Sequence, residues 1–291
     1  MSADPTGPAG FGDRLAAALV ERAPLCVGVD PSASLLARWG LSDDGDGVAA
    51  FGRAVLDAVE GLVAVVKPQS AFFERHGSAG VAVLEELCRD ARSRGLLVLL
   101  DVKRGDIGST SQAYAQAYLN ADSPFAVDAI TATPYLGVAS LAPMFEAAQA
   151  SGRGVFVLAR SSNPEGERIQ DARVGGAGAD VSDVVAHVLA EVGAVNAAAP
   201  GAALGAIGVV FGATCETENY DLLAFGGPIL APGLGAQGAT VDDIAKRFAG
   251  YEDRVLPSVS RAVLGSGPDV AAMRATASEL AAACRKALAR G

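Results

Sequence analysis

Charged side chains that could perform acid–base chemistry gather in one segment, DVKRGDIGST at positions 101–110. This segment carries Asp101, Lys103 and Asp106, and its first residues continue an apolar run. Because side chains alternate along a strand, Asp101 and Lys103 are predicted to share one face. Lys67 also ends an apolar run, although the chain has only four lysines. Lysine is rarely buried without a partner, so an inward-facing array of ammonium and carboxylate groups is expected.

Such an array has a definite chemical use. Each charge keeps its neighbours ionised where water is excluded. A held ammonium group can then stabilise and protonate a carbanion, while a carboxylate faces a substrate anion. The alternative is a salt-bridge network without chemistry. A Schiff-base lysine needs a lowered pKa, which flanking carboxylates oppose, so that reaction is disfavoured.

The elements that must position these residues are short apolar runs, which alternate with amphipathic helical patterns. Continuous apolar runs suit strands buried on both faces of a parallel sheet. Eight runs with interleaved helices predict a single-domain (β/α)₈ barrel over residues 1–291. An open doubly wound sheet is the alternative, but no G-x-G-x-x-G follows the first run. The runs lie at 25–30, 62–68, 96–103, 126–133, 154–160, 207–212, 228–233 and 254–260, and the clearest helical patterns at 47–61, 78–94, 108–121 and 269–290.

Three segments depart from this rhythm. Residues 1–20 are predicted to form an N-terminal extension or helix. Residues 38–47, RWGLSDDGDG, are predicted to form a polar loop. Residues 161–206 separate the fifth and sixth runs, and we expect an insertion there that enlarges the loop and carries a helix near 181–195.

Two glycine-rich segments follow the last two runs. The first spans 231–239 and includes Gly235 and Gln237, and the second spans 265–267, shortly after Arg261. Loops after strands seven and eight of such barrels often bind phosphate through backbone N–H groups. Arg261 would add a charged fork. The sequence therefore predicts a phosphate site at these loops.

Composition limits the other classes of function. The net charge is 23 − 33 = −10, which argues against an electrostatically driven nucleic-acid binder. We find no apolar stretch long enough for a membrane span and no signal-peptide pattern at the start, so a cytoplasmic protein is expected. The four cysteines and two histidines show no zinc spacing, and no metal site is expected.

Together these motifs resemble those of the orotidine 5′-phosphate decarboxylase family. The resemblance spans about residues 25 to 267, in the same order along the chain. The longer segments 67–73 and 159–166 resemble the larger bacterial subfamily, often called type 2. The matching residues are Asp101, Lys103, Asp106, Ile107 and Thr110 in D-x-K-x-x-D-I-x-x-T, Val29-Asp30-Pro31, Val66-Lys67-Pro68-Gln69, Pro232-Gly233-x-Gly235-Ala236-Gln237-Gly238 and Ser260-Arg261.

The resemblance implies decarboxylation of orotidine 5′-monophosphate to UMP and CO₂, the last step of de novo UMP biosynthesis, with no metal or other cofactor. By this analogy Lys103 protonates C6 after CO₂ leaves. Asp101 would lie near the substrate carboxylate, and Lys67 would hold the charged network and contact the ribose. Asp106 and Thr110 would reach into the partner's site, which implies a homodimer with shared active sites.

The remaining implied contacts concern substrate binding. Asp30 would bind ribose hydroxyls, and Ser162 (or Ser161, since both precede Asn163) would contact the pyrimidine. Gln237 and Arg261 would hold the phosphate, in the loop that also contains Gly235.

Two rival functions follow from the same motifs. Relatives with D-x-K-x-x-D that use Mg²⁺ on sugar phosphates carry an acidic metal ligand where this chain has Lys67, and a cation there disfavours a divalent metal. A nucleotide-binding barrel that has lost catalysis is the second rival, but nothing is missing from the motif.

Overall fold

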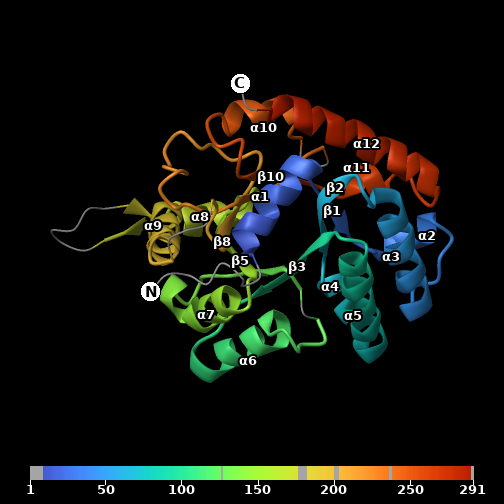
Figure 1. Cartoon of the computed structure of the whole chain (residues 1–291), viewed down its shortest axis with the longest axis horizontal. Coiled ribbons are helices and arrows are strands. Elements are labelled where there is room, and N and C mark those ends of the chain that lie inside the picture. The colour runs from blue at the N-terminus through green and yellow to red at the C-terminus, as the bar shows by residue number, and fades with distance from the viewer. Residues whose placement is uncertain (1–8, 126, 176–181, 200–202, 236–237, 290–291) are drawn as a thin grey trace.

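The computed structural model describes residues 9–125, 127–175, 182–199, 203–235 and 238–289. Within these residues, eight parallel strands close into a barrel in the order β1-β10-β9-β8-β5-β4-β3-β2. Figure 1 shows the helices arranged around these strands. The predicted (β/α)₈ barrel is confirmed. Its strands are β1 (Ala23–Val29), β2 (Val63–Pro68), β3 (Leu97–Arg104), β4 (Ala129–Ala132), β5 (Gly154–Arg160), β8 (Ile207–Phe211), β9 (Ile229–Pro232) and β10 (Val255–Val259).

Most strands are followed by helices that pack on the outside of the barrel. The four long helical patterns correspond to α3 (Gly45–Val59), α5 (Gly77–Ser93), α6 (Gly108–Leu119) and α12 (Val270–Ala287). The other helices of the barrel are α1 (Phe11–Glu21), α2 (Ala33–Arg38), α4 (Ala71–Glu74), η1 (Val138–Leu141), α7 (Ala142–Ala150), α10 (Val241–Arg247) and α11 (Arg261–Leu264).

The prediction of a polar loop over 38–47 is wrong at both of its ends. Arg38 is the last residue of α2, and α3 already begins at Gly45. The cause of the early start is a helix cap, since the Asp44 carboxylate accepts the N–H of Gly47 at 3.0 Å. Gly47 itself lies so close to the Ser42 carbonyl that a Cβ would meet that oxygen at 1.8 Å.

Two apolar cores hold the barrel. The larger core lies between strands and helices, and the smaller one fills the barrel interior with inward side chains such as Val65, Leu99 and Phe156. Phe11 and Leu15 of α1 belong to the inner core, and the Phe11 ring meets Phe156 edge-on at 5.9 Å. Helix α1 therefore closes the end of the barrel where the strands begin, which leaves the opposite end free for a site.

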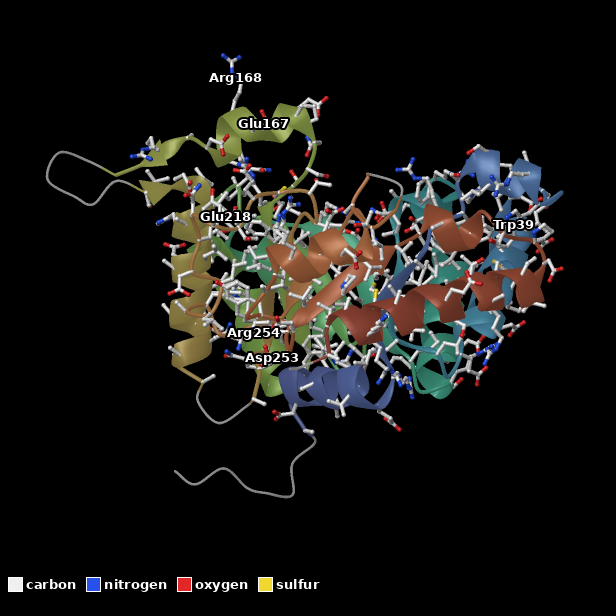
Figure 2. The ribbon with its side chains drawn as sticks, turned by 90° about the horizontal axis from the view of Figure 1, so that it is seen from above. Trp39, Glu167, Arg168, Glu218, Asp253 and Arg254 are labelled. Atoms are coloured by element: carbon white, nitrogen blue, oxygen red, sulfur yellow. The ribbon has the colours of Figure 1, made fainter. Side chains whose placement is uncertain are left out.

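The enlarged loop after β5 has its own structure. It contains α8 (Pro164–Gln170), a two-stranded antiparallel ribbon of β6 (Arg173–Val174) and β7 (Ser182–Asp183), and α9 (Val184–Ala197). In Figure 2, α8 stands above the barrel, and Arg168 points away from the body of the molecule. Across the described ranges, no helix combines the length and apolar character that crossing a membrane requires.

Candidate active site

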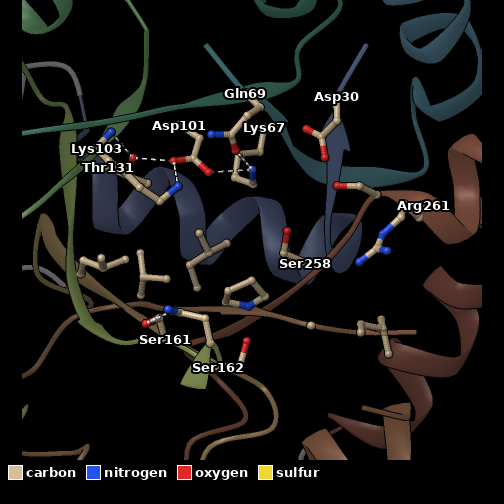
Figure 3. Close-up of a pocket in the computed structure, with 18 residues that line it drawn as sticks. Asp30, Lys67, Gln69, Asp101, Lys103, Thr131, Ser161, Ser162, Ser258 and Arg261 are labelled. Carbon is tan, nitrogen blue, oxygen red and sulfur yellow. Dashed lines mark hydrogen bonds and ion pairs between the residues drawn. The ribbon is translucent and has the colours of Figure 1, made fainter. Parts of the chain in front are cut away.

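A pocket of about 330 Å³ opens where the barrel strands end. Its polar lining comes from β2, β3, β4 and β10, from the residues that follow β1, β2, β5 and β10, and from the start of α11 (Figure 3). Apolar side chains such as Leu158, Val210 and Leu230 form its floor and wall. The pocket therefore combines an apolar surface with converging charged groups, as small-molecule sites do.

Three charged groups form the centre of the site. Nζ of Lys67 lies 2.9 Å from Oδ2 of Asp101, and Nζ of Lys103 lies 2.6 Å from Oδ1 of the same carboxylate. The side chains of Lys67 and Asp101 are only 8% and 7% exposed, whereas that of Lys103 is 45% exposed. Lys67 also donates to Oε1 of Gln69 at 3.3 Å. The Lys67 ammonium is thus enclosed, while that of Lys103 faces the open pocket (Figure 3).

The electrostatics keep this array ionised. Burial raises the pKa of the Asp101 carboxyl, but the charges of Lys67 and Lys103 outweigh burial and lower it to about 2. Burial likewise lowers the pKa of Lys67, but the carboxylates of Asp101 and Asp30 outweigh that effect and raise it above its ordinary value. Burial raises the pKa of the neighbouring Cys26 thiol to about 12, so this cysteine stays protonated.

The backbone of β3 is irregular at Lys103. Lys103 has a φ of 44°, and among the described residues it is the one residue other than glycine with a positive φ. Such a conformation costs a residue with a Cβ atom about 1–3 kcal/mol and is often found at functional sites. The Lys103 N–H donates to Oγ1 of Thr131 on β4 at 2.9 Å.

Asp30 and Arg261 lie at the other side of the pocket in Figure 3. Oδ1 of Asp30 is buried and has no hydrogen-bond partner within the described chain. The pocket wall here depends on Gly28, because a Cβ at that position would meet Oγ of Ser260 at 1.9 Å. Since an unpaired buried carboxylate oxygen is costly, Asp30 suits a ligand that brings hydroxyl donors.

Ser161 and Ser162 both line the pocket, on the side opposite the charged array in Figure 3. Gln170, the last residue of α8, holds Ser161 through two hydrogen bonds. Its Nε2 donates to Oγ of Ser161 at 2.7 Å, and its Oε1 accepts the Ser161 N–H at 3.2 Å. Oγ of Ser161 also lies 2.7 Å from Oδ1 of Asn163. Helix α8 thereby fixes the loop that presents both serines.

The structure does not bring every predicted site residue to this pocket. Asp106 and Thr110 are absent from the described lining, and Oδ1 of Asp106 accepts the neighbouring Ile107 N–H at 2.8 Å. Gly235 lies beyond Gly233, which does line the pocket, and takes a φ of +77°. Gln237 lies outside the described residues.

Sequence reasoning gave no role to two buried hydroxyl residues of the lining, Thr131 and Ser258, which are 1% and 4% exposed. Each lies on an inward position near the end of a barrel strand, which is the signal that could have identified them. For metals, no group of three or more His, Cys, Asp or Glu side chains that could bind an ion occurs in the described part of the chain.

Comparison with known proteins places this chain in a family. The model of the orotidine 5′-phosphate decarboxylase / HUMPS family matches residues 23–276. The chain belongs to this family. An orotidine 5′-phosphate decarboxylase of Salinispora arenicola is 57% identical over 278 residues, covering 96% of this chain and 98% of that protein.

Solved structures of family members share the fold. A candidate orotidine 5′-phosphate decarboxylase from Streptomyces avermitilis superposes with a TM-score of 0.91 at 51% identity and 100% coverage of both chains. The OMP decarboxylase of Leishmania donovani gives a TM-score of 0.77 at 27% identity, covering 97% of this chain and 100% of that one.

Proposed function

We propose that this protein is a carboxy-lyase that converts orotidine 5′-monophosphate to UMP and CO₂, the last step of de novo UMP biosynthesis. The observation that carries this proposal is the Lys67–Asp101–Lys103 array at the mouth of the barrel. Relatives that are 52–57% identical over 96% of this chain bear the same activity in their names. The enlarged segment after β5 also supports membership of the larger bacterial subfamily.

The pocket suits one orientation of the substrate. Arg261 binds the phosphate, together with the loop after β9 that contains Gly235 and Gln237. Asp30, whose Oδ1 is buried and unpaired, accepts ribose hydroxyls, and Ser162 or Ser161 contacts the pyrimidine. This orientation directs C6 and its carboxylate toward Asp101 and Lys103.

Catalysis then needs one bond cleavage and one proton transfer. The bond between C6 and the carboxylate carbon breaks, CO₂ leaves, and the electron pair stays on C6. The Lys103 ammonium stabilises this developing charge from a fixed position and transfers a proton to C6, after which solvent restores its proton. Before the transfer, Asp101 holds the Lys103 ammonium as an ion pair at 2.6 Å, and binding energy from the distant phosphate contributes to the chemical step.

The residue types favour a mechanism without a metal. The Lys67 ammonium occupies the position where Mg²⁺-dependent relatives carry an acidic ligand, and it is paired with the Asp101 carboxylate. A divalent cation at this carboxylate would have to displace two ammonium groups. The array itself therefore supplies the charge that such a metal would bring.

A homodimer with shared sites completes the proposal. Asp106 and Thr110 do not reach the pocket of their own chain, but they lie on the loop and helix that follow Lys103. Large apolar side chains are exposed nearby: Ile107 at 61%, and Tyr135 and Leu136 at 78% and 54% in the loop after the neighbouring β4. Exposed apolar groups of this size mark interaction surfaces, and a second copy would bring its Asp106 and Thr110 to this pocket.

The test is a decarboxylation assay that follows the absorbance of orotidine 5′-monophosphate with and without EDTA. We expect rapid conversion to UMP at the same rate in both conditions. Activity that is lost in EDTA would instead support the Mg²⁺-dependent rival. Binding of UMP without conversion of orotidine 5′-monophosphate would support a barrel that has lost catalysis.

A further inference from the structure

We infer that Thr131 is a positioning residue that holds Lys103 in its reactive place; this inference rests on the proposed decarboxylation. Thr131 lies on β4, lines the pocket and is only 1% exposed. None of the family motifs found in the sequence includes it. Its side chain contacts two of the three charged residues of the array, as Figure 3 shows.

The irregularity of β3 explains why a side chain is needed here. Leu100 pairs with Ile130 and Arg104 with Ala132, so 104 − 100 = 4 positions on β3 face 132 − 130 = 2 positions on β4. The extra residues of β3 leave the regular ladder, and Lys103 adopts its φ of 44°. The Lys103 N–H then donates to Oγ1 of Thr131 instead of a backbone carbonyl. Thr131 therefore accepts a part-buried backbone N–H that the β3–β4 ladder no longer pairs.

The same hydroxyl also joins the two ends of Lys103. Oγ1 of Thr131 accepts the backbone N–H of Lys103 at 2.9 Å and donates its proton to Oδ1 of Asp101 at 2.8 Å. Oδ1 of Asp101 in turn accepts the Nζ of Lys103 at 2.6 Å. These three hydrogen bonds form a closed ring. The backbone N–H and the Nζ of Lys103 are thereby both held by Oδ1 of Asp101, the first through Thr131 and the second directly.

Loss of the hydroxyl should affect the chemical step more than substrate binding. A reacting group displaced by about 1 Å can lose two orders of magnitude in rate. The groups proposed to bind ribose and phosphate, Asp30 and Arg261, lie at the opposite side of the pocket from Thr131 in Figure 3. An interaction that acts only near the transition state lowers kcat while KM stays nearly constant.

The experiment compares Thr131→Val, which keeps the branched shape but removes the hydroxyl, with Thr131→Ser, which keeps the hydroxyl. We expect kcat to fall roughly 10- to 100-fold in Thr131→Val, with KM changed less than about threefold, and to return to within about threefold of the native value in Thr131→Ser. Thr217→Val is the matched control, because Thr217 is also buried (6% exposed) and its hydroxyl donates only to the carbonyl of Arg247, away from the pocket.

Each outcome decides the inference. A native kcat in Thr131→Val, or a loss that Thr131→Ser shares or that Thr217→Val reproduces, would overturn the positioning role while leaving the proposed decarboxylation intact. If the unchanged protein does not convert orotidine 5′-monophosphate, the proposed function fails first and this inference with it. Should Thr131→Val not fold, Thr131→Ala removes the same hydroxyl and allows the same comparison with Thr131→Ser.

Discussion

At the scale of single residues, Lys67 and Lys103 share one carboxylate but occupy different surroundings. Lys67 is enclosed with Asp101 and with Gln69, whereas nearly half of the Lys103 side chain is accessible from the pocket. An enclosed ammonium with a fixed partner holds the array together, and an accessible one can meet a substrate atom. This difference supports a structural and electrostatic task for Lys67 and proton transfer for Lys103.

Replacement of the shared carboxylate should destabilise the protein. In Asp101→Asn the buried Lys67 loses its ion-pair partner, and breaking a buried ion pair from one side typically costs about 3–5 kcal/mol. We expect the free energy of unfolding in urea at pH 7 to fall by this order. Asp57→Asn makes the same substitution in a surface ion pair and serves as the control, because Asp57 is half exposed and pairs with Arg94. The free energy of unfolding should fall by less than about 1 kcal/mol in Asp57→Asn.

The Asp101 carboxyl should also make the free energy of unfolding depend on pH. The pKa of Asp101 is about 2 in the folded protein, below its ordinary value of 3.8. A lowered pKa stabilises the folded state above pH 4, and this stabilisation is lost as the pH falls from about 4 to about 2. Urea unfolding measured across this range should show a steeper decline for the native protein than for Asp101→Asn. Equal slopes would contradict the charge state assigned to Asp101.

The sequence could predict the contacts within the site that follow from strand alternation, but not the one that follows from an irregularity in β3. The proximity of Asp101 and Lys103 follows from strand alternation, and Lys67 ends an adjacent strand, so sequence reasoning could place all three together. The role of Thr131 could not be foreseen, because it arises from the register shift between Leu100 and Arg104. Extra residues of this kind bend one strand and interrupt the ladder, and the apolar run at 96–103 gives no sign of where they fall.

At the scale of elements, the strands were predictable because each is a short apolar run that is buried on both faces. The prediction of a loop over 38–47 missed the start of α3 for a local reason, since α3 opens with Gly45-Asp46-Gly47 and glycine is a weak helix former. The cap from Asp44 compensates for it. The ribbon of β6 and β7 has only two residues in each strand, which is too short for a detectable alternation.

Helix α12 offers a test of element stability that is separate from catalysis. Asp269 caps this helix by accepting the N–H groups of Ala271 and Ala272 at 2.8 and 3.1 Å. Asp269→Ala should lower the free energy of unfolding by about 1 kcal/mol, and Asp269→Ser, which can still cap, should restore most of it. We expect kcat to stay unchanged in both. A loss that Asp269→Ser does not recover would show that the cap is not the cause.

At the scale of the whole molecule, the site described in one chain lacks two of its predicted members. Asp106 and Thr110 lie beyond the pocket, next to exposed apolar side chains. A second copy related by a twofold axis would cover this surface and complete both sites at once. Sequence reasoning could suggest this arrangement only through the family resemblance, because nothing local distinguishes a residue that serves its own site from one that serves a partner's.

Mixed dimers test the shared site directly. Lys103→Ala and Asp106→Ala should each be strongly impaired alone. When the two variants are unfolded together and refolded as a mixture, one site of each mixed dimer combines a native Lys103 with a native Asp106 from the other chain. Random pairing should then restore about a quarter of the native activity. Mixtures that stay as inactive as their components would show that Asp106 serves its own chain.

Proton delivery by the Lys103 ammonium is the step that completes the proposed decarboxylation. It is tested most directly by measuring the turnover of orotidine 5′-monophosphate and the binding of UMP in Lys103→Ala. We expect kcat to fall by at least about a thousandfold while the Kd for UMP stays within about tenfold of the native value. Formation of UMP at a rate near that of the native protein would contradict it.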